Sequence, residues 1–213
     1  MQNRTANLKN TMKKLLLIPF ALCFACSSSP QTMEDMAEYE MTGWTATAVP
    51  KVDIPAELLS AICSGISQNF DTAVSNIDNG RLYNQVQNEI DALLGEYDEP
   101  TEAQIASATS EVVKGLSPEQ TAQFSQHLAA LNQSYGTILA EFIKGSATSL
   151  IVAELIADVD SMALDMFQAI LVVSQLSDLI ADWNMAMAMK DTTEIYIDRY
   201  EQWNRAASSG RSR

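Results

Sequence analysis

The chain has 213 residues, with 27 acidic and 13 basic side chains and a formal net charge of −14 at pH 7. A field of that sign repels nucleic acid and anionic lipid headgroups, so a nucleic-acid partner is not expected. With a single histidine, the chain lacks the His-Glu-x-x-His and Glu-x-x-His spacings of zinc and di-iron sites, and its one Cys-x-x-Cys spacing, from Cys23 to Cys26, falls at the end of the apolar run near the front of the chain. Its glycines form no phosphate-binding loop. We therefore predict no catalytic residues, no metal site and no cofactor.

An apolar run marks the front of the chain. Lys13 and Lys14 precede residues 15–25, which are almost wholly apolar, and Cys26 follows. A membrane span needs about 20 such residues, so this shorter run is typical of an export signal. We predict a signal peptide over residues 1–25, with Met12 as an alternative start.

The residues around Cys26 resemble the lipobox of bacterial lipoproteins: small Ala25, then the cysteine, then polar Ser27 to Pro30. The resemblance implies that Cys26 is acylated, for example with palmitate, and becomes the first residue of the mature chain. Ser27, which is not the retention residue aspartate, implies the outer membrane. Cys23 and Phe24 depart from the family pattern. The alternative is ordinary cleavage after Ala25, which would give an unlipidated periplasmic or secreted protein.

Residues 26–54 are expected to form the acylated cysteine and a flexible acidic tether, because they contain Ser, Thr, Pro and acids but few aliphatic side chains. Trp44 is the exception. We expect its ring to dock on the domain that follows.

Residues 55–207 show helical periodicity and predict a helical-bundle domain. Turn and capping signals divide this region into helices over about 55–77, 82–97, 101–115, 117–145, 147–190 and 191–207, with 147–190 forming either one helix or two. The strongest start signal is Ser117-Pro118-Glu119-Gln120. Residues 208–213 are expected to be a frayed tail. The predicted fold class is all-α, an antiparallel bundle of five or six helices.

The stretch from Met162 to Trp183 is the most uniformly apolar helix, and it predicts the centre of the bundle. On this interpretation Leu171 is buried, while Gln168 belongs to a narrow polar strip.

Four weaker signals favour structural roles. His127 lies at the edge of an apolar stripe and is interpreted as a hydrogen-bonded core histidine, in preference to a haem ligand. Cys63 is expected to be a buried, inert thiol. The alternating methionines Met185, Met187 and Met189 are interpreted as core packing rather than a Cu(I) site. Glu154, Asp158 and Asp165, at steps of four and seven, are interpreted as a solvated strip on one helix face rather than a cation site.

These observations predict an outer-membrane lipoprotein anchored by its N-terminal acyl group, with a helical domain in a structural or partner-binding role and no enzymatic activity. The alternative is a periplasmic bundle that holds a metal, a haem or an apolar ligand between its helices. The partner itself is not identified by the sequence.

Overall fold

The computed structural model describes residues 32–77 and 80–209, and residues from Met33 onward belong to one structural unit. Six α-helices follow one another in these ranges: α3 (Met33–Ala37), α4 (Pro50–Asn76), α5 (Arg81–Leu94), α6 (Glu102–Lys114), α7 (Pro118–Asp158) and α8 (Met166–Ser209). No strand occurs in the described ranges. The all-α bundle is confirmed. The signal peptide, Cys26 and residues 210–213 lie outside the described residues.

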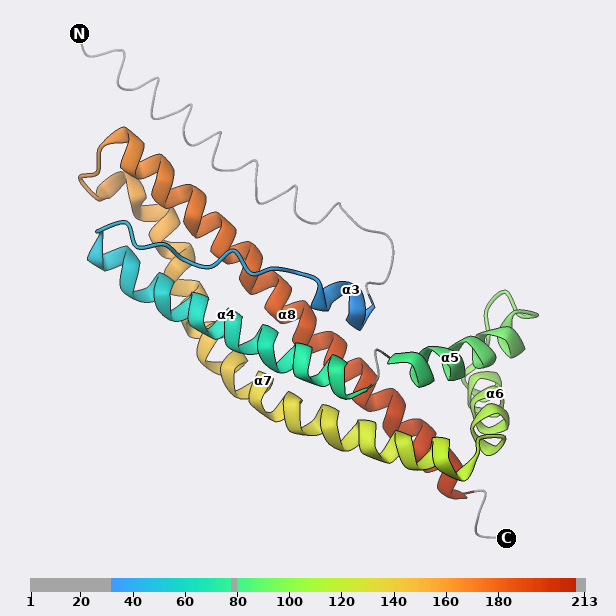
Figure 1. Cartoon of the computed structure of the whole chain (residues 1–213). Helices are drawn as coiled ribbons and strands as arrows, with labels where there is room; N and C mark the ends of the chain where they lie inside the picture. Colours follow the sequence, from blue (N-terminus) through green and yellow to red (C-terminus); the bar gives the residue numbers. More distant parts are fainter. Residues whose placement is uncertain (1–31, 78–79, 210–213) are drawn as a thin grey trace. The chain divides into compact units, whose positions relative to one another are not determined.

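Three long helices make the core. α7 runs antiparallel to both α4 and α8, and the three pack along most of their length (Figure 1). Their facing sides bury aliphatic and aromatic residues at helical spacing, which removes apolar surface from water and stabilises the bundle. Fully buried examples are Leu59, Ile66 and Phe70 of α4, Leu131 and Ile138 of α7, and Leu176 and Leu179 of α8.

Gly145 of α7 lies at a close contact with both α8 and α4. A Cβ atom added there would lie 2.3 Å from Cζ3 of Trp183 on α8 and 3.0 Å from Cγ2 of Ile62 on α4. Only glycine leaves room for the indole ring at this point. The expectation that a helix ends at Gly145 is therefore wrong, because this glycine serves packing and not termination.

The first turn of α7 agrees with the sequence. Ser117 caps the helix, its hydroxyl accepting from the backbone NH of Gln120 while the Gln120 side chain accepts from the backbone NH of Ser117. The helix ends at Asp158, and a short 3-10 turn, η2 (Val159–Ser161), leads to Asp165. The Asp165 carboxylate accepts from the backbone NH groups of Phe167 and Gln168 and so caps α8. Residues 147–190 are therefore divided between two helices, α7 and α8, which answers the question of one helix or two that the sequence left open.

α8 continues through residues 191–194, where the sequence predicted a new helix. Thr193 donates its hydroxyl hydrogen to the backbone carbonyl of Met189 instead of capping. Lys190 forms ion pairs with Asp191 at 2.9 Å and Glu194 at 2.7 Å. The pair of Lys190 with Glu194 has the i, i+4 spacing of neighbours on one helix face and supports a continuous helix. Ser208, expected to begin a frayed tail, also lies within α8.

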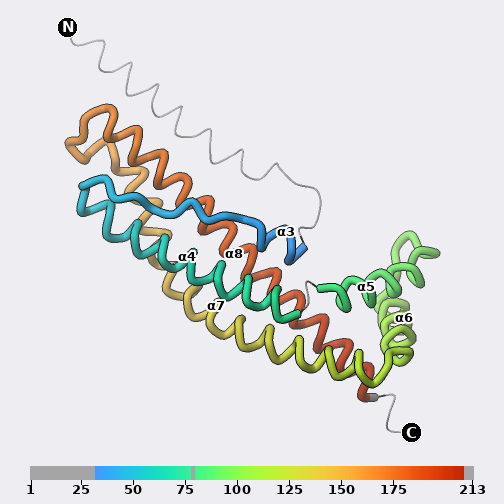
Figure 2. The backbone as a smooth tube through the Cα atoms, in the orientation of Figure 1, coloured from blue at the N-terminus to red at the C-terminus, as the bar shows by residue number. Residues whose placement is uncertain are grey.

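The tether predicted for residues 26–54 needs correction over its described part. Met33 and Met36 of α3 are buried in the core. Residues 38–49, which we call the strap, then run along α4 and α8 to the start of α4 at Pro50 (Figure 2). Trp44 packs against the core, as expected. The domain boundary predicted at residue 55 is therefore wrong, because this segment is held by buried methionines and by two carboxylates described below.

α5 and α6 form a helical hairpin beside the C-terminal part of α8. Gly80 precedes α5 with φ +65°, a left-handed conformation that glycine adopts without strain. Tyr83 of α5 stacks on Tyr196 of α8 with ring centroids 4.0 Å apart. Tyr200, Trp203 and Phe124 complete this aromatic cluster. The cluster joins the hairpin to the bundle.

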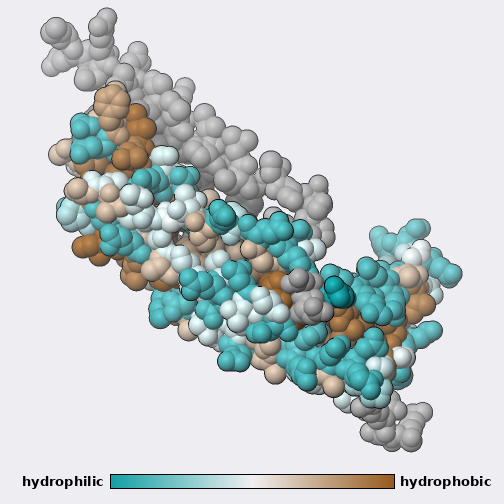
Figure 3. All heavy atoms as spheres, viewed as in Figure 1, coloured by the Kyte–Doolittle hydropathy of each residue, from teal (hydrophilic) through white to brown (hydrophobic). Residues whose placement is uncertain are grey.

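The start of α8 does not occupy the centre of the bundle. Leu171 is 49% exposed and Phe167 is 78% exposed. Figure 3 shows hydrophobic residues gathered at the end of the unit where α7 turns into α8. The prediction that Leu171 is buried is wrong, because no described segment covers this side of α8. The buried stretch of α8 begins at Val172.

Candidate functional site

Two buried carboxylates hold the strap. Asp182 of α8 is 0% exposed. One of its oxygens accepts from the hydroxyl of Tyr39 and from the backbone NH of Thr42, both at 3.1 Å, and the other accepts from the backbone NH of Gly43 at 3.0 Å. Gly43 has φ +77° at this contact. Three donors satisfy a charge that would otherwise be costly to bury.

Asp53 of α4 repeats the arrangement at the other end of the strap. Its carboxylate accepts from the backbone NH of Thr47 at 2.8 Å, the Thr47 hydroxyl at 3.1 Å and the Trp44 indole at 3.3 Å. Burial by itself would raise the pKa of Asp53, but these hydrogen bonds outweigh it and hold the pKa below its usual value. The strap is thus fixed at both ends by charge-assisted bonds.

Cys63 and Tyr39 lie close to Asp182. Burial, reinforced by the Asp182 charge, raises the pKa of the Cys63 thiol to about 12. Burial, and after it the Asp182 charge, also raises the pKa of Tyr39 to about 12. A thiol held protonated is a poor nucleophile. The structure therefore places Cys63 in the inert, buried position that the sequence predicted.

His127 belongs to the aromatic cluster. Its Nδ1 lies 3.1 Å from the hydroxyl of Tyr200, and the two rings meet edge to face. His127 is buried and Tyr200 fully so, and burial raises the pKa of Tyr200. The interpretation of His127 as a hydrogen-bonded core histidine is confirmed.

The remaining sequence candidates do not come together as a site. Met189 is buried in the core, and Met185 and Met187 pack partly buried against it, as the packing interpretation predicted. Glu154, Asp158 and Asp165 are all exposed. The expectation that these acids share one helix face is wrong, because α7 ends at Asp158 and Asp165 caps the next helix. Within residues 32–77 and 80–209, no group of three or more His, Cys, Asp or Glu side chains is placed to hold a metal ion.

Glu34 of α3 is a further buried carboxylate. Both of its oxygens are inaccessible and make no hydrogen bond in the structure. A Cβ atom added at Gly80 would lie 2.7 Å from one of them, so the glycine leaves room for the carboxylate beside the start of α5. An unpaired buried charge is costly. This contact explains why position 80 is a glycine. It does not define a functional site.

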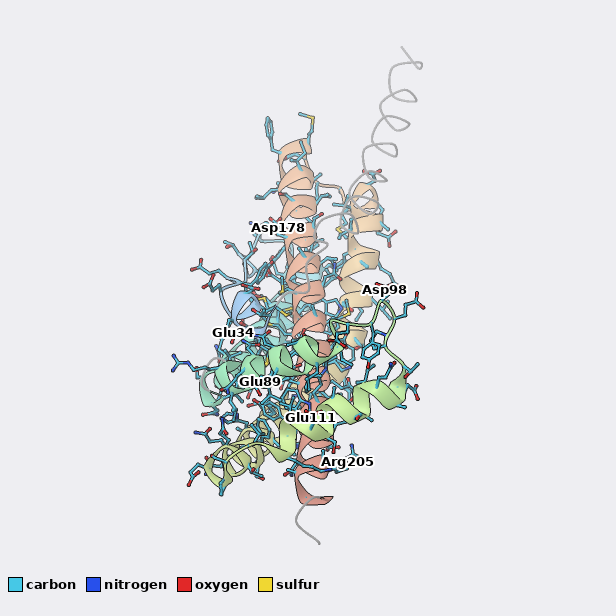
Figure 4. The ribbon with its side chains drawn as sticks, turned by 90° about the vertical axis from the view of Figure 1, so that its right-hand side faces the viewer. Glu34, Glu89, Asp98, Glu111, Asp178 and Arg205 are labelled. Carbon is cyan, nitrogen blue, oxygen red and sulfur yellow. The ribbon has the colours of Figure 1, made fainter. Side chains whose placement is uncertain are left out.

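The α5–α6 hairpin and the first turn of α7 form an open groove of about 490 Å³. Its rim carries Glu89 of α5 and Glu111 of α6, which Figure 4 shows on adjoining helices. Its lining also includes the apolar residues Ala92, Leu93, Val112 and Leu116 and the polar residues Gln85 and Gln120. The described residues that line this groove include no basic side chain. A groove whose lining combines acidic and apolar side chains matches a segment that has one basic and one apolar face.

This groove was not recognisable in the sequence. Glu89 and Glu111 belong to different helices, and only the fold of the hairpin brings them to one rim. The anchoring role of Asp182 was also missed. A single acid inside the apolar stripe of α8 was the available signal, since buried acids require partners.

No helix in the described part of the chain combines the length and hydropathy needed to cross a membrane. Comparison with known proteins identifies no relative, because no protein-family model, no curated protein and no solved structure matches the chain.

Proposed function

We propose that the protein is an outer-membrane lipoprotein, anchored through an acylated Cys26, whose helical unit binds a partner protein in the α5–α6 groove. The anchor rests on the sequence alone: basic Lys13 and Lys14, an apolar run, Ala25, Cys26 and a polar flank. The binding role rests on the groove, whose acidic and apolar lining residues are available to another molecule.

The docked strap determines the reach of this anchor. Met33 is buried in the core, so only residues 27–32 separate Cys26 from the folded unit. Cys26 and Met33 are seven residues apart in the sequence, which corresponds to at most about 25 Å in a fully extended chain. An acyl group on Cys26 would therefore keep the helical unit next to the bilayer, whereas a tether that continued to residue 54 would let it move farther away.

The partner that fits the groove is a basic amphipathic helix. Lysine or arginine on one face would meet Glu89 and Glu111, and leucine-like side chains on the other would cover Leu93, Val112 and Leu116. Burial of the apolar face would supply affinity, while the paired charges would give orientation and a fast, salt-sensitive association. The overall charge of −14 favours the approach of such a segment.

Metabolic labelling with palmitate tests the anchor. Wild-type protein should incorporate the label, and the Cys26→Ala variant should not, because the thiol that carries the acyl chain is gone. Cys63→Ala serves as the control, since that thiol is buried in the folded unit. Equal labelling of wild type and Cys26→Ala, or no label in wild type, contradicts the anchor.

A model peptide tests the groove. A fluorescent amphipathic peptide of leucine and lysine should bind the full chain, and the double variant Glu89→Gln, Glu111→Gln should bind it about tenfold more weakly. The matched control is Asp178→Asn, Glu201→Gln, which removes the same charge at exposed positions of α8. Equal weakening by both double variants would mean that the peptide responds only to net charge.

A further inference from the structure

The outer side of α7 carries a second, uncovered apolar stripe. Gly136, Ala140, Ile143, Ala147 and Leu150 follow one another at steps of four and three, the spacing of a coiled-coil seam. All five are exposed, and Ile143 and Leu150 are each 66% exposed. We call these five residues the outer seam. They lie opposite the face of α7 that packs on α4 and α8, so the bundle itself gives no reason for their apolar character.

Gly136 is the most informative member of the outer seam. A Cβ atom added there would meet nothing within 4 Å, whereas the same atom at Gly145 would overlap Trp183. Glycine inside a helix costs about 1 kcal/mol relative to alanine. Packing within the chain accounts for Gly145 and does not account for Gly136. A side chain from a second molecule, seated in the notch above Gly136, would account for it.

The pattern of sizes in the outer seam is complementary to its own reverse. When two copies of α7 are laid antiparallel about Ile143, Gly136 of each lies opposite Leu150 of the other. Ala140 lies within one residue of Ala147, and the two Ile143 side chains meet at the centre. The large Leu150 thus meets the small Gly136 at both ends of the seam, and the alanines between each end and the centre allow the helix backbones to come close.

Charge does not oppose contact between two copies at the outer seam. The chain carries −14 overall, so two copies repel each other over most of their surface. The outer seam and its flanking positions Thr137, Leu139, Ser146 and Ile151 contain no acid. The single charge beside the seam, Lys144, is compensated by Glu141 of its own helix at 2.8 Å. Two seams can therefore meet without contact between acids.

We propose that the protein self-associates as a twofold-symmetric dimer through antiparallel contact of the outer seams of α7. The seam is about 21 Å long at 1.5 Å per residue, so it buries less than a standard interface and forms a weak, reversible dimer. This contact uses a different face from the α5–α6 groove and does not depend on the anchor at Cys26.

Cysteine cross-linking of the purified full chain tests this proposal. Gln133→Cys and Glu154→Cys place exposed thiols just beyond the two ends of the seam, where the antiparallel arrangement brings position 133 next to position 154 of the other copy. The two variants carry tags of different size and are mixed at about 100 µM, a concentration suited to a weak dimer. A short bismaleimide should give a mixed dimer band and little of either homodimer band. The unsubstituted chain, with its native cysteines, gives the background.

The specificity control uses the same substitution at two exposed isoleucines. Ile143→Glu in both reporters should reduce the mixed band about tenfold, because it places two carboxylates face to face in an apolar contact. Ile195→Glu on α8, also exposed, should leave the band unchanged. Bands between identical positions would overturn the antiparallel arrangement. Absence of the mixed band, or equal loss with both glutamates, would overturn the proposal, whatever the labelling and peptide experiments show.

Discussion

The two ends of α8 have similar apolar composition and opposite environments. In the first turns, Met166, Phe167, Ile170 and Leu171 are all exposed. Farther along, Leu176, Leu179, Met189 and Tyr200 are fully buried. α8 contacts α7 over much of its length, but α3, α4, α6 and the strap cover the later part of it. The difference therefore comes from the number of elements that surround each end.

This contrast shows that hydrophobicity along a helix does not by itself locate the core. A helix that is apolar on nearly every face is expected to be surrounded. The start of α8 meets that description, yet it lies on the surface of the described unit. Where apolar surface stays uncovered over a contiguous area, contact with another molecule becomes the natural physical interpretation.

The largest expected effect comes from placing one charge at each end of α8. Leu176→Asp buries a carboxylate that has no partner, at a cost of several kcal/mol. Since domains of this kind are stable by about 5–15 kcal/mol, that variant should be largely unfolded. Leu171→Asp, at an exposed position, should change stability by less than about 1 kcal/mol. Thermal melts followed by circular dichroism compare the two, and similar melting temperatures would refute the contrast.

A second comparison uses the two glycines of α7. Gly145→Ala forces a methyl group against Trp183 and should lower stability by about 1–3 kcal/mol. Gly136→Ala meets no atom of the chain, and the better helix propensity of alanine should raise stability by up to about 1 kcal/mol. Urea denaturation of both variants measures the two free energies. Changes of the same sign would contradict the packing described at Gly145.

The strap provides a third test, at the covered part of α8. Asp182→Asn weakens three hydrogen bonds to the strap, each of which gains strength from the carboxylate charge. We expect a loss of about 1–3 kcal/mol and faster proteolytic cleavage between residues 39 and 49. Asp178→Asn, one turn earlier and exposed, is the control. Unchanged cleavage in Asp182→Asn would mean that the strap is held by its apolar contacts alone.

The smallest expected effect is a dependence on pH at the other end of the strap. The pKa of Asp53 is lowered in the folded chain, while the unfolded value is near 3.9. Its contribution to stability is therefore present above about pH 4 and is lost as the pH falls through the folded pKa. Asp53→Asn should flatten this part of the stability profile. Asp98→Asn, in the exposed α5–α6 loop, should leave the profile unchanged.

Local signals predicted the helices well where the determining contacts are local. The helix starts predicted at Thr101 and Ser117 are the positions at which the structure has capping boxes, and the break before Gly80 separates α4 from α5. Errors occurred where contacts distant in sequence decide. Gly145 has the appearance of a helix end until its contact with Trp183 is known, and residues 191–194 have the appearance of a cap until the bond from Thr192 to Met36, 156 positions away, is known.

The strap and the groove required tertiary information of another kind. Residues 33–49 have the composition of a linker, and what orders them is a pair of aspartates from α4 and α8 and the burial of their own Met33 and Met36 in the core. The groove rim brings together Glu89 and Glu111 from two helices whose existence was predicted but whose packing was not. Sequence periodicity predicts faces of helices and does not predict which faces meet.

The strap also constrains the order in which the molecule is assembled. The partner at one of its ends is far away along the chain, because Thr42 meets Asp182 across 140 positions and Tyr39 meets it across 143. This end of the strap must therefore wait for the last helix before it docks. Contacts of such long range are slow to form, since the entropy of closing the intervening loop is lost first. During that interval Tyr39, Thr42 and Gly43 lack the carboxylate that holds them in the folded chain, so this part of the strap is open to proteases until α8 is complete.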